Sequence, residues 1–356
     1  MPEDLTILLI LKDRTPFTWR WLHHANTIKL PYKVIIADGG EDFSLENKLA
    51  DKKQFPNVNY DYIRYPHDKD IATYFLKLAN SSKLIKTSFV LLASNHDFYF
   101  IDSIKESLEF LKSHPDFASV RGEIYDISIQ DKKIKDFHKT YFNPANTANT
   151  GLERLEAYSK KPGSLWHDIN RTINIQKAFT HFHESGINDI VLAEYLLNAI
   201  IVLSGKTHRT DKLHMLHQEP VDGLGLTLSK RDPIEWMASE NWSEYFLGII
   251  NIISNELATR DDIAKNVSYN KSLQIFLAYF LGKNMISDHS IRKSDHSQSF
   301  IIRRSRFINK NNVFKKIGKK IYLFAKNHKQ NSLNKNIVQT SPYGRELRQI
   351  EDFLRS

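Results

Sequence analysis

The residues best suited to chemistry follow an apolar run at positions 88–94. This run, SFVLLAS, is rich in branched and aromatic side chains and predicts a buried β-strand, and Asn95, His96 and Asp97 come directly after it. In an open α/β sheet, ligands bind in the crevice at the carboxyl ends of the strands. Polar side chains at such a point can coordinate a ligand, or they can form an ordinary turn, because Asn and Asp are common turn residues.

Acidic residues also follow the other strands predicted in the first hundred residues. Strands are predicted over 5–11, 32–37 and 57–65, and the acidic residues beyond them are Asp13, Asp38 and Asp70. Asp38 precedes Gly39-Gly40 and is equally suited to a simple turn. Together with Asp97, these carboxylates predict a polar crevice at one sheet edge that can bind a metal ion or a ribose.

Helices are predicted after the strands. Thr15-Pro16 begins one with a capping residue and a proline at the first helical position, and apolar spacing predicts another from about 71 to 84. Three strand–helix units in about a hundred residues predict the α/β class with a doubly wound, mainly parallel sheet.

The middle of the chain predicts a mixture of elements. A helix over 102–112 and a strand over 118–126 precede a polar stretch, 130–163, that is expected to be a long loop, and 164–168 is expected to form a short aromatic strand.

A second group of polar residues surrounds Asp189. An apolar helix is predicted after it, with Asn188 able to cap the helix and Gly205 ending it, which places Asp189 in the first turn. Asp189 can serve there as a reactive carboxylate or only as a capping acid. His214 and His217 follow on a predicted strand and would face opposite sides, so at most one of them is expected to bind a metal ion.

Composition divides the chain into three parts. The net charge is +9, yet residues 286–356 carry 16 Lys and Arg against 5 Asp and Glu, so the basicity belongs to the tail. We expect a catalytic domain over 1–228, a helical accessory segment over 229–285 in which Trp236 and Trp242 pack, and a basic tail over 286–356 with amphipathic helices. Apolar and basic residues alternate over 301–326, as in a helix lying on an anionic membrane surface or in a basic helix packed on the catalytic domain.

Several classes of protein are excluded by composition. The absence of cysteine excludes disulfides and thiolate metal sites. No apolar stretch is long enough to span a bilayer, and the acidic start, MPED, does not fit a secretory signal. We therefore expect a cytoplasmic protein, with peripheral contact to the inner face of the cell membrane through 301–326.

These motifs, in this order, resemble the family 2 type of bacterial glycosyltransferases with the glycosyltransferase-A fold, in particular the branch that assembles polysaccharides and capsules. The segment 11–17 resembles the family's opening motif, Asp38-Gly39-Gly40 its Asp-Gly-Ser, and Asn95-His96-Asp97 its Asp-x-Asp. Asn188-Asp189, Gly205 and His217 resemble the later Glu-Asp pair, glycine and histidine. The resemblance covers roughly residues 5–220, and the chain departs from it where Asn95 and Asn188 replace acids.

The resemblance implies an inverting, metal-assisted transfer of a sugar from a nucleotide sugar, with a UDP-sugar expected, to a hydroxyl of a glycan or lipid-linked glycan. It makes Asp189 the general base and assigns Mg²⁺ or Mn²⁺ to Asp97, assisted by His96 or His217. The residues that it implies for donor binding are Asp13, Arg14, Asp38, Lys69, Asp70, Asn95 and His96. Those that it implies for acceptor binding are Trp166, His167 and Glu184.

Two other functions fit parts of the sequence. A sugar nucleotidyltransferase uses a similar sheet, but it needs a glycine-rich phosphate loop, and LKDRT at 11–15 has no glycine. A non-catalytic protein could use the basic tail to bind a membrane or nucleic acid. Under the glycosyltransferase interpretation no nucleic acid is expected as a partner.

Overall fold

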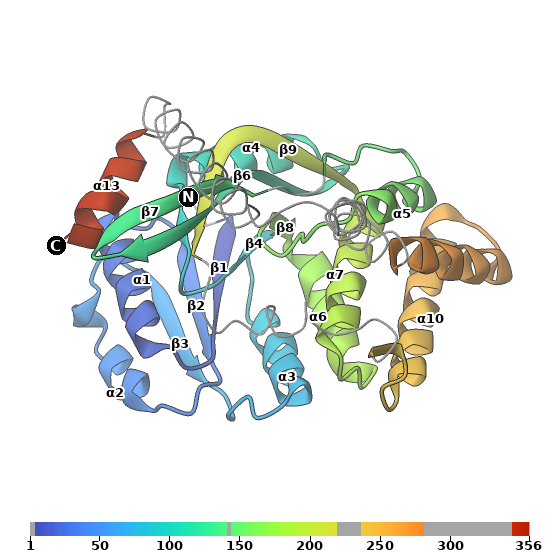
Figure 1. The fold of residues 1–356 in the computed structure, drawn as a ribbon, viewed down its shortest axis with the longest axis horizontal. Coiled ribbons are helices and arrows are strands. Elements are labelled where there is room, and N and C mark those ends of the chain that lie inside the picture. The colour runs from blue at the N-terminus through green and yellow to red at the C-terminus, as the bar shows by residue number, and fades with distance from the viewer. Residues whose placement is uncertain (1–3, 141–143, 219–235, 281–343, 356) are drawn as a thin grey trace, which may run out of the picture.

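The computed structural model describes residues 4–140, 144–218, 236–280 and 344–355. These residues form one nine-stranded sheet with helices packed around it. Its strand order is β3-β2-β1-β4-β8-β6-β9-β5, and β7 pairs with β6 outside this path. Figure 1 shows the sheet with helices packed around it and a helical region at one end.

The first half of the sheet is parallel. Strands β1, β2, β3 and β4 pair side by side in parallel register, with α3 leading into β4. The elements are β1 (Leu5–Leu11), α1 (Thr15–Thr27), β2 (Lys33–Asp38), α2 (Ser44–Ala50), η1 (Lys52–Gln54), β3 (Tyr60–Arg64), α3 (Ile71–Ser82) and β4 (Phe89–Ala93).

The second half of the sheet is mixed. Strand β8 is antiparallel to both β4 and β6, β6 is parallel to β9, and β5 and β7 pair antiparallel with β9 and β6. The elements are β5 (Phe98–Tyr99), α4 (Ile101–Ser113), β6 (Phe117–Gln130), β7 (Lys133–Lys139), α5 (Gly151–Lys160), β8 (Ile169–Arg171), α6 (Thr172–Glu184), α7 (Ile190–Ser204) and β9 (Lys206–Gln218).

Successive side chains of the parallel strands pack alternately into two hydrophobic cores. On β1, Leu8 belongs to one cluster with residues of α3, α6 and α7, whereas Ile7 and Leu9 belong to another with residues of α1, α2 and α4. Successive side chains of a strand point to opposite faces, so this division places helices on both faces of the sheet. The predicted α/β class and doubly wound arrangement are confirmed.

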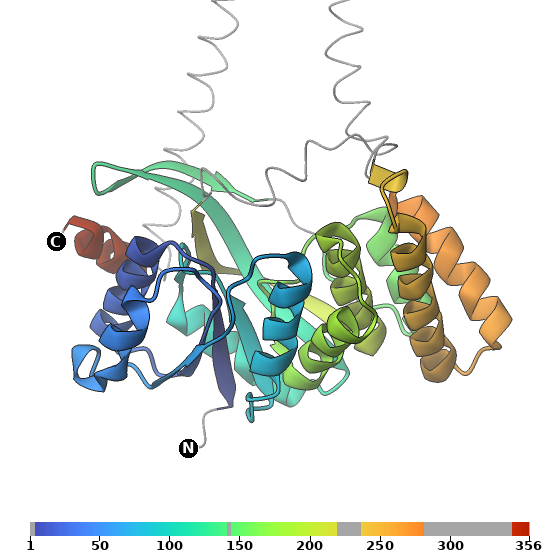
Figure 2. The same ribbon diagram turned by 90° about the horizontal axis from the view of Figure 1, so that it is seen from below.

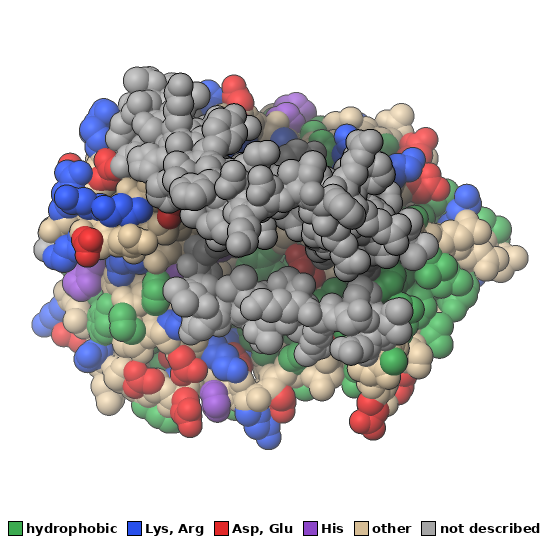
Figure 3. Space-filling view, viewed as in Figure 1, with side chains coloured by type: hydrophobic (Ala, Val, Ile, Leu, Met, Phe, Trp, Pro, Cys, Tyr) green, Lys and Arg blue, Asp and Glu red, His purple; other side chains and the backbone are tan. Residues whose placement is uncertain are grey.

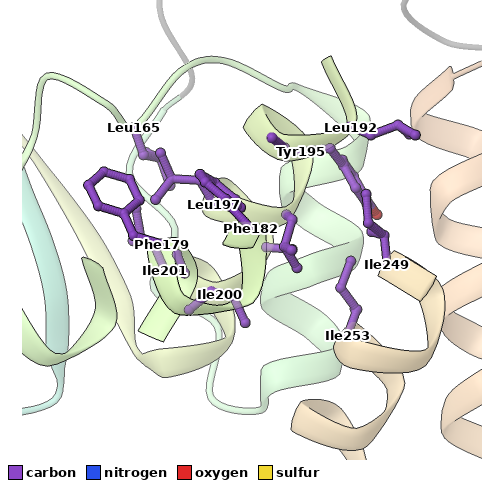
Figure 4. Packing of buried hydrophobic residues seen from close by; sticks show 14 of the residues in the cluster. Leu165, Phe179, Phe182, Leu192, Tyr195, Leu197, Ile200, Ile201, Ile249 and Ile253 are labelled. Atoms are coloured by element: carbon purple, nitrogen blue, oxygen red, sulfur yellow. The ribbon is translucent and has the colours of Figure 1, made fainter. Parts of the chain in front are cut away.

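Helix α7 is the most deeply buried helix of the larger core. Leu197, Ile200 and Ile201 are at most 1% exposed, and Figure 4 shows them between Phe179 of α6 and Ile253 of the next helical layer. That layer contains α10 (Trp242–Asp261) and the helical residues 265–280. The predicted packing of the two tryptophans is confirmed, because the rings of Trp236 and Trp242 lie 5.4 Å apart.

The prediction of a long loop over 130–163 is wrong. Strand β7 forms in it by antiparallel pairing with β6, and its Ile134 and Phe137 are buried while the residues around them face solvent. Helix α5 also forms in it and begins at a capping box, in which Thr150 and Glu153 bond each other's backbone N–H groups.

The strand predicted over 164–168 is also misplaced. Residues 166–168 form a turn, and the strand is β8, which directly follows them. Its buried Ile169 and Asn170 pair with both β4 and β6, so this short strand joins the two halves of the sheet.

The described part of the tail is α13 (Gly344–Arg355), which lies beside β7 and α1 in both ribbon views (Figures 1 and 2). The amphipathic segment predicted over 301–326 lies outside the described residues. Within the described ranges, no helix combines the length and hydropathy needed to cross a bilayer.

Charged side chains of both signs share the described surface. In Figure 3, Lys and Arg gather with Asp and Glu at the end of the molecule where β7 and α13 lie. Three lysines, Lys132, Lys133 and Lys135, line a shallow hollow there with Glu351 and Arg355.

His24 of α1 makes the stability of the fold sensitive to pH. Burial, followed by the nearby charge of Arg20, lowers the pKa of His24 to about 4, and its Nε2 is buried without a hydrogen-bond partner. The unfolded chain takes up this proton near pH 6.5, so stability falls as the pH drops from about 6.5 towards 4.

We therefore predict that His24→Leu reduces the pH dependence of unfolding. Between pH 7 and pH 5 the variant should lose about 2 kcal/mol less free energy of unfolding than the wild type, because one shifted group contributes about 1.4 kcal/mol per pH unit. Urea unfolding at both pH values measures this difference. His183→Leu, at an exposed position on α6, is the control and should follow the wild type.

Candidate active site

A two-residue strand pairing assembles the centre of the site. Phe98 of β5 lies opposite Leu216 of β9, so Asp97, which precedes β5, faces His217, the next residue of β9. His217 Nδ1 lies 2.8 Å from Asp97 Oδ1, and His96 Nε2 lies 3.8 Å from the same oxygen.

These three residues offer ligand atoms that all lie within 4.8 Å of one another. Burial lowers the pKa of His96, so its imidazole is neutral and can bind a metal ion. Burial alone would raise the pKa of Asp97, but the hydrogen bond from His217 and the electrostatic effect of His217, His96 and His167 together lower it, so the carboxylate is ionised. One carboxylate and two imidazoles fit a divalent cation.

Two further histidines support this cluster. The ring of His167 lies 5.6 Å from that of His217, and burial lowers the pKa of His167 to about 4. His214 is fully buried and its Nε2 bonds the backbone oxygen of His167 at 3.0 Å. Of His214 and His217, His217 alone joins the metal cluster found among the described residues, as strand alternation predicts.

The structure separates the residues expected to bind an acceptor. His167 lies beside the metal cluster, whereas the ring of Trp166 packs 6.0 Å from Phe179. Glu184 is exposed at the last position of α6. Their role in acceptor binding stays a prediction.

Asp38 forms a second polar centre at the end of β2. Its Oδ1 accepts a hydrogen bond from Gly40 N at 2.9 Å, and its Oδ2 accepts bonds from Tyr62 Oη at 2.7 Å and Arg64 at 3.1 Å. Asp13 joins this loop by accepting a bond from Glu41 N at 2.6 Å. Sequence analysis missed Tyr62 and Arg64, although both lie on the predicted third strand.

Asp68 is the buried acid of the third strand–helix connection. It is 1% exposed and forms an ion pair with the equally buried Lys77, whose Nζ also donates to the backbone oxygen of Leu11 at 2.6 Å. A side chain at Gly39 would lie 2.5 Å from the Asp68 carboxyl carbon, so this approach requires glycine. The pair joins three loops at the carboxyl edge of the sheet.

The predicted residues of this connection are more exposed. Asp70 caps α3 by accepting bonds from the backbone and side chain of Thr73, both at 2.7 Å, and Lys69 is exposed. The sequence HDKD at 67–70 contains two acids, either of which could bind a donor. Asp70 points towards solvent, and Asp68 does not, because Asp70 caps α3. Donor binding by Lys69 and Asp70 stays a prediction.

The start of α1 borders the metal cluster. Asn95 is buried, and its amide donates to Thr18 Oγ1 at 2.9 Å, so this side chain holds the loop against α1. Arg14 precedes α1 and its charge contributes to lowering the pKa of His96. Arg20, which sequence analysis missed, donates to Gln218 Oε1 at 2.7 Å and lies near the charge of Asp97. Cationic side chains therefore lie beside the cluster.

Asp189 is the N-cap residue of α7, so the prediction that Asn188 would fill this position is wrong. Its Oδ1 accepts bonds from Val191 N and Leu192 N, both at 2.9 Å, and its Oδ2 accepts one from Trp236 Nε1 at 2.6 Å. Asn188 is exposed instead. Because β8 runs antiparallel to β4, β8 ends and α6 begins at the amino edge of β4. Helix α6 then runs back to the carboxyl edge. Asp189, which follows α6, therefore lies at the same edge as Asp97.

Comparison with known proteins identifies the fold. No protein-family model matches the sequence, and no curated protein matches it. Among solved structures, the chain is similar to TarS of S. aureus, with a TM-score of 0.51 and 11% identity over 78% of this chain and 43% of the TarS chain. TarS 1-349 in complex with UDP-GlcNAc gives a TM-score of 0.50 and 11% identity over 78% of this chain and 72% of that chain.

The fold is of the glycosyltransferase-A type. The chain spans less than half the length of the longer TarS structure. At this low identity the likeness establishes the architecture, and the chemistry has to be argued from the side chains of this chain.

The Asp68–Lys77 pair gives a prediction about stability. Lys77→Met leaves the Asp68 carboxylate buried without its partner and should cost about 3–5 kcal/mol in free energy of unfolding. The double variant Asp68→Asn with Lys77→Met removes both charges and should recover most of that loss. Guanidinium unfolding measures both values, and equal losses in the single and double variants would contradict the ion-pair explanation.

Proposed function

We propose that this protein is an inverting, divalent-metal-assisted glycosyltransferase that moves a sugar from a UDP-sugar to a hydroxyl of a glycan acceptor. The observation that carries the proposal is the cluster of His96, Asp97 and His217 at the carboxyl edge of a sheet of glycosyltransferase-A type. The similar TarS structure in complex with UDP-GlcNAc supports a nucleotide sugar as the donor.

The donor would extend from the Asp38 loop to the metal cluster. Asp13, Asp38 and Asp70 would bind the base and ribose by accepting hydrogen bonds, and Tyr62 and Arg64 hold the Asp38 carboxylate in place. Nearer the cluster, Asn95 and His96 would border the diphosphate. Arg14 and Lys69 supply positive charge along the same edge, and Arg20 adds to it from α1.

Asp97, His217 and His96 would hold the metal ion. A divalent cation there supplies Lewis-acid stabilisation of the charge that develops on the diphosphate leaving group. Of the two cations expected, Mg²⁺ prefers a shell of oxygen ligands, whereas imidazole ligands suit the transition metals. The two histidines therefore favour Mn²⁺ over Mg²⁺.

Asp189 would act as the general base. The acceptor hydroxyl oxygen attacks the anomeric carbon, Asp189 takes the hydroxyl proton, and the bond to the nucleoside diphosphate breaks on the opposite face. One displacement of this kind inverts the anomeric configuration. Trp166, His167 and Glu184 would border the acceptor, as the family resemblance implies.

The proposal extends to surface polysaccharide biosynthesis. A glycan or lipid-linked glycan would be the acceptor, and residues 301–326 would bring a cytoplasmic enzyme to the inner face of the cell membrane. The alternation of basic and apolar residues in that segment supports this placement.

A panel of nucleoside diphosphates, each with and without Mn²⁺, tests the donor and the metal together. We expect UDP to raise the melting temperature, more strongly with Mn²⁺ than without it, because ligands that bind only the folded state stabilise it. Asp97→Asn should abolish the additional shift from Mn²⁺. Asp61→Asn, on the exposed edge of the sheet at β3, is the matched control and should behave as wild type. The absence of a shift with any nucleotide would contradict the proposed donor site.

Asp189→Asn tests the general base while keeping an oxygen that can cap α7. We expect kcat for sugar transfer to fall by about 10²–10⁴-fold, the usual contribution of general acid–base catalysis, with little change in UDP affinity. Asp261→Asn is the control, because this acid bonds the backbone of Gly151 and Leu152 at the start of α5. Transfer by folded Asp189→Asn at the wild-type rate would exclude Asp189 as the base.

A further inference from the structure

The C-terminal helix α13 packs beside β7 and shares a hydrophobic cluster with β5 and β9, the two strands that bring the metal-cluster residues together. Its buried Leu347, Ile350 and Leu354 belong to one hydrophobic cluster with Phe98 of β5 and Leu216 of β9. These last two residues are opposite each other in the sheet, and they immediately adjoin Asp97 and His217.

A hydrogen bond ties the same helix to the end of β5. Glu346 Oε2 accepts a bond from Ile101 N at 2.7 Å, where α4 begins two residues after β5. The backbone N–H of Phe100, just before it, donates to the backbone oxygen of His214 on β9 at 3.0 Å. Helix α13 therefore restrains the short chain segment that begins at Asp97.

Ring contacts provide a third connection. The ring of Phe353 lies 5.2 Å from His24, and His24 lies 5.1 Å edge-on to Phe98. The guanidinium of Arg20, one turn before His24 on α1, lies 5.1 Å from the same Phe98 ring. The ring of Phe98 therefore contacts α1 directly and is linked to α13 through His24. Figures 1 and 2 show α1 and α13 as neighbouring helices.

Strand β5 needs this support because it is so short. It contributes only two residues to the pairing with β9, and short pairings are marginal without a packed hydrophobic face. The separation of Asp97 and His217 therefore depends on the burial of Phe98 and Leu216, and α13 supplies part of that burial.

We propose that α13 is a positioning element for the metal cluster, so that Ile350 and Glu346 set the affinity for a divalent cation without touching it. This inference rests on the proposed function, which assigns the metal ion to His96, Asp97 and His217. Residues that orient metal ligands typically change the affinity for the metal by about 10–100-fold when they are replaced.

The test uses full-length variants and direct titration with Mn²⁺, with the free ion followed by its electron paramagnetic resonance signal. We expect Ile350→Ala and Glu346→Ala to bind Mn²⁺ about 10-fold or more weakly. Glu346→Gln keeps an acceptor oxygen for Ile101 N and should restore most of the affinity. Ile350→Val, which loses a single methylene group, replaces Ile350→Ala if that variant does not fold.

Two matched controls separate positioning from general stability. Ile253→Ala truncates a buried isoleucine of α10 in the separate hydrophobic cluster around α7 and should lower the melting temperature without changing Mn²⁺ affinity. Arg348→Ala, at an exposed position of α13, should change neither quantity.

Two results would overturn the positioning role while leaving the proposed function intact. One is wild-type Mn²⁺ affinity in Ile350→Ala and Glu346→Ala, and the other is an equal loss of affinity in Ile253→Ala. A wild-type protein that does not bind Mn²⁺ would instead overturn the metal-assisted function, and this inference with it.

Discussion

The pairing of Phe98 with Leu216 is the interaction on which the arrangement of the site depends. It converts two residues distant in sequence, Asp97 and His217, into neighbours whose side chains form a 2.8 Å hydrogen bond. A shift of one residue in this register would turn the facing side chains to the opposite side of the sheet. The fold therefore surrounds this short pairing with α1, α4 and α13.

Buried charges at the sheet edge are held in the same manner, by partners from separate elements. Asp38 is bonded by Tyr62 and Arg64 from β3, and Asp68 is paired with Lys77 from α3. Burying a carboxylate is costly unless hydrogen bonds or opposite charges replace its water. These partners keep the loops between strands and helices in one conformation, which a ligand would otherwise have to impose on binding.

The sequence predicted the parallel half of the sheet well, because its information is local. Strands such as β1 and β4 are continuous apolar runs, and the polar residues after them mark the carboxyl edge. The second half was harder, because β8 and β5 contain three and two residues and exist only through their partners. The capping box of α5 could have been recognised in the sequence as the start of a helix, but it lies in a polar stretch that was interpreted as a loop.

The candidate site shows the same division between local and long-range information. Strand alternation separated His217 from His214, but no local pattern could show that His167 lies beside His217 or that Arg20 reaches Gln218. Sequence analysis could place Asp70 as the residue that caps α3, but the burial of Asp68 depends on Lys77 from α3 and on the space at Gly39.

The 120 positions that separate Asp97 from His217 also affect how the chain is made. During synthesis, the parallel strands β1 to β4 leave the ribosome well before β8 and β9. Until then, the apolar edge of β4 has no neighbour, and an unpaired strand edge is a template for aggregation. The nascent protein therefore passes through a stage in which the parallel half of the sheet is present and the strands of the second half have not yet been made. A chaperone that covers β4 at that stage would favour correct folding.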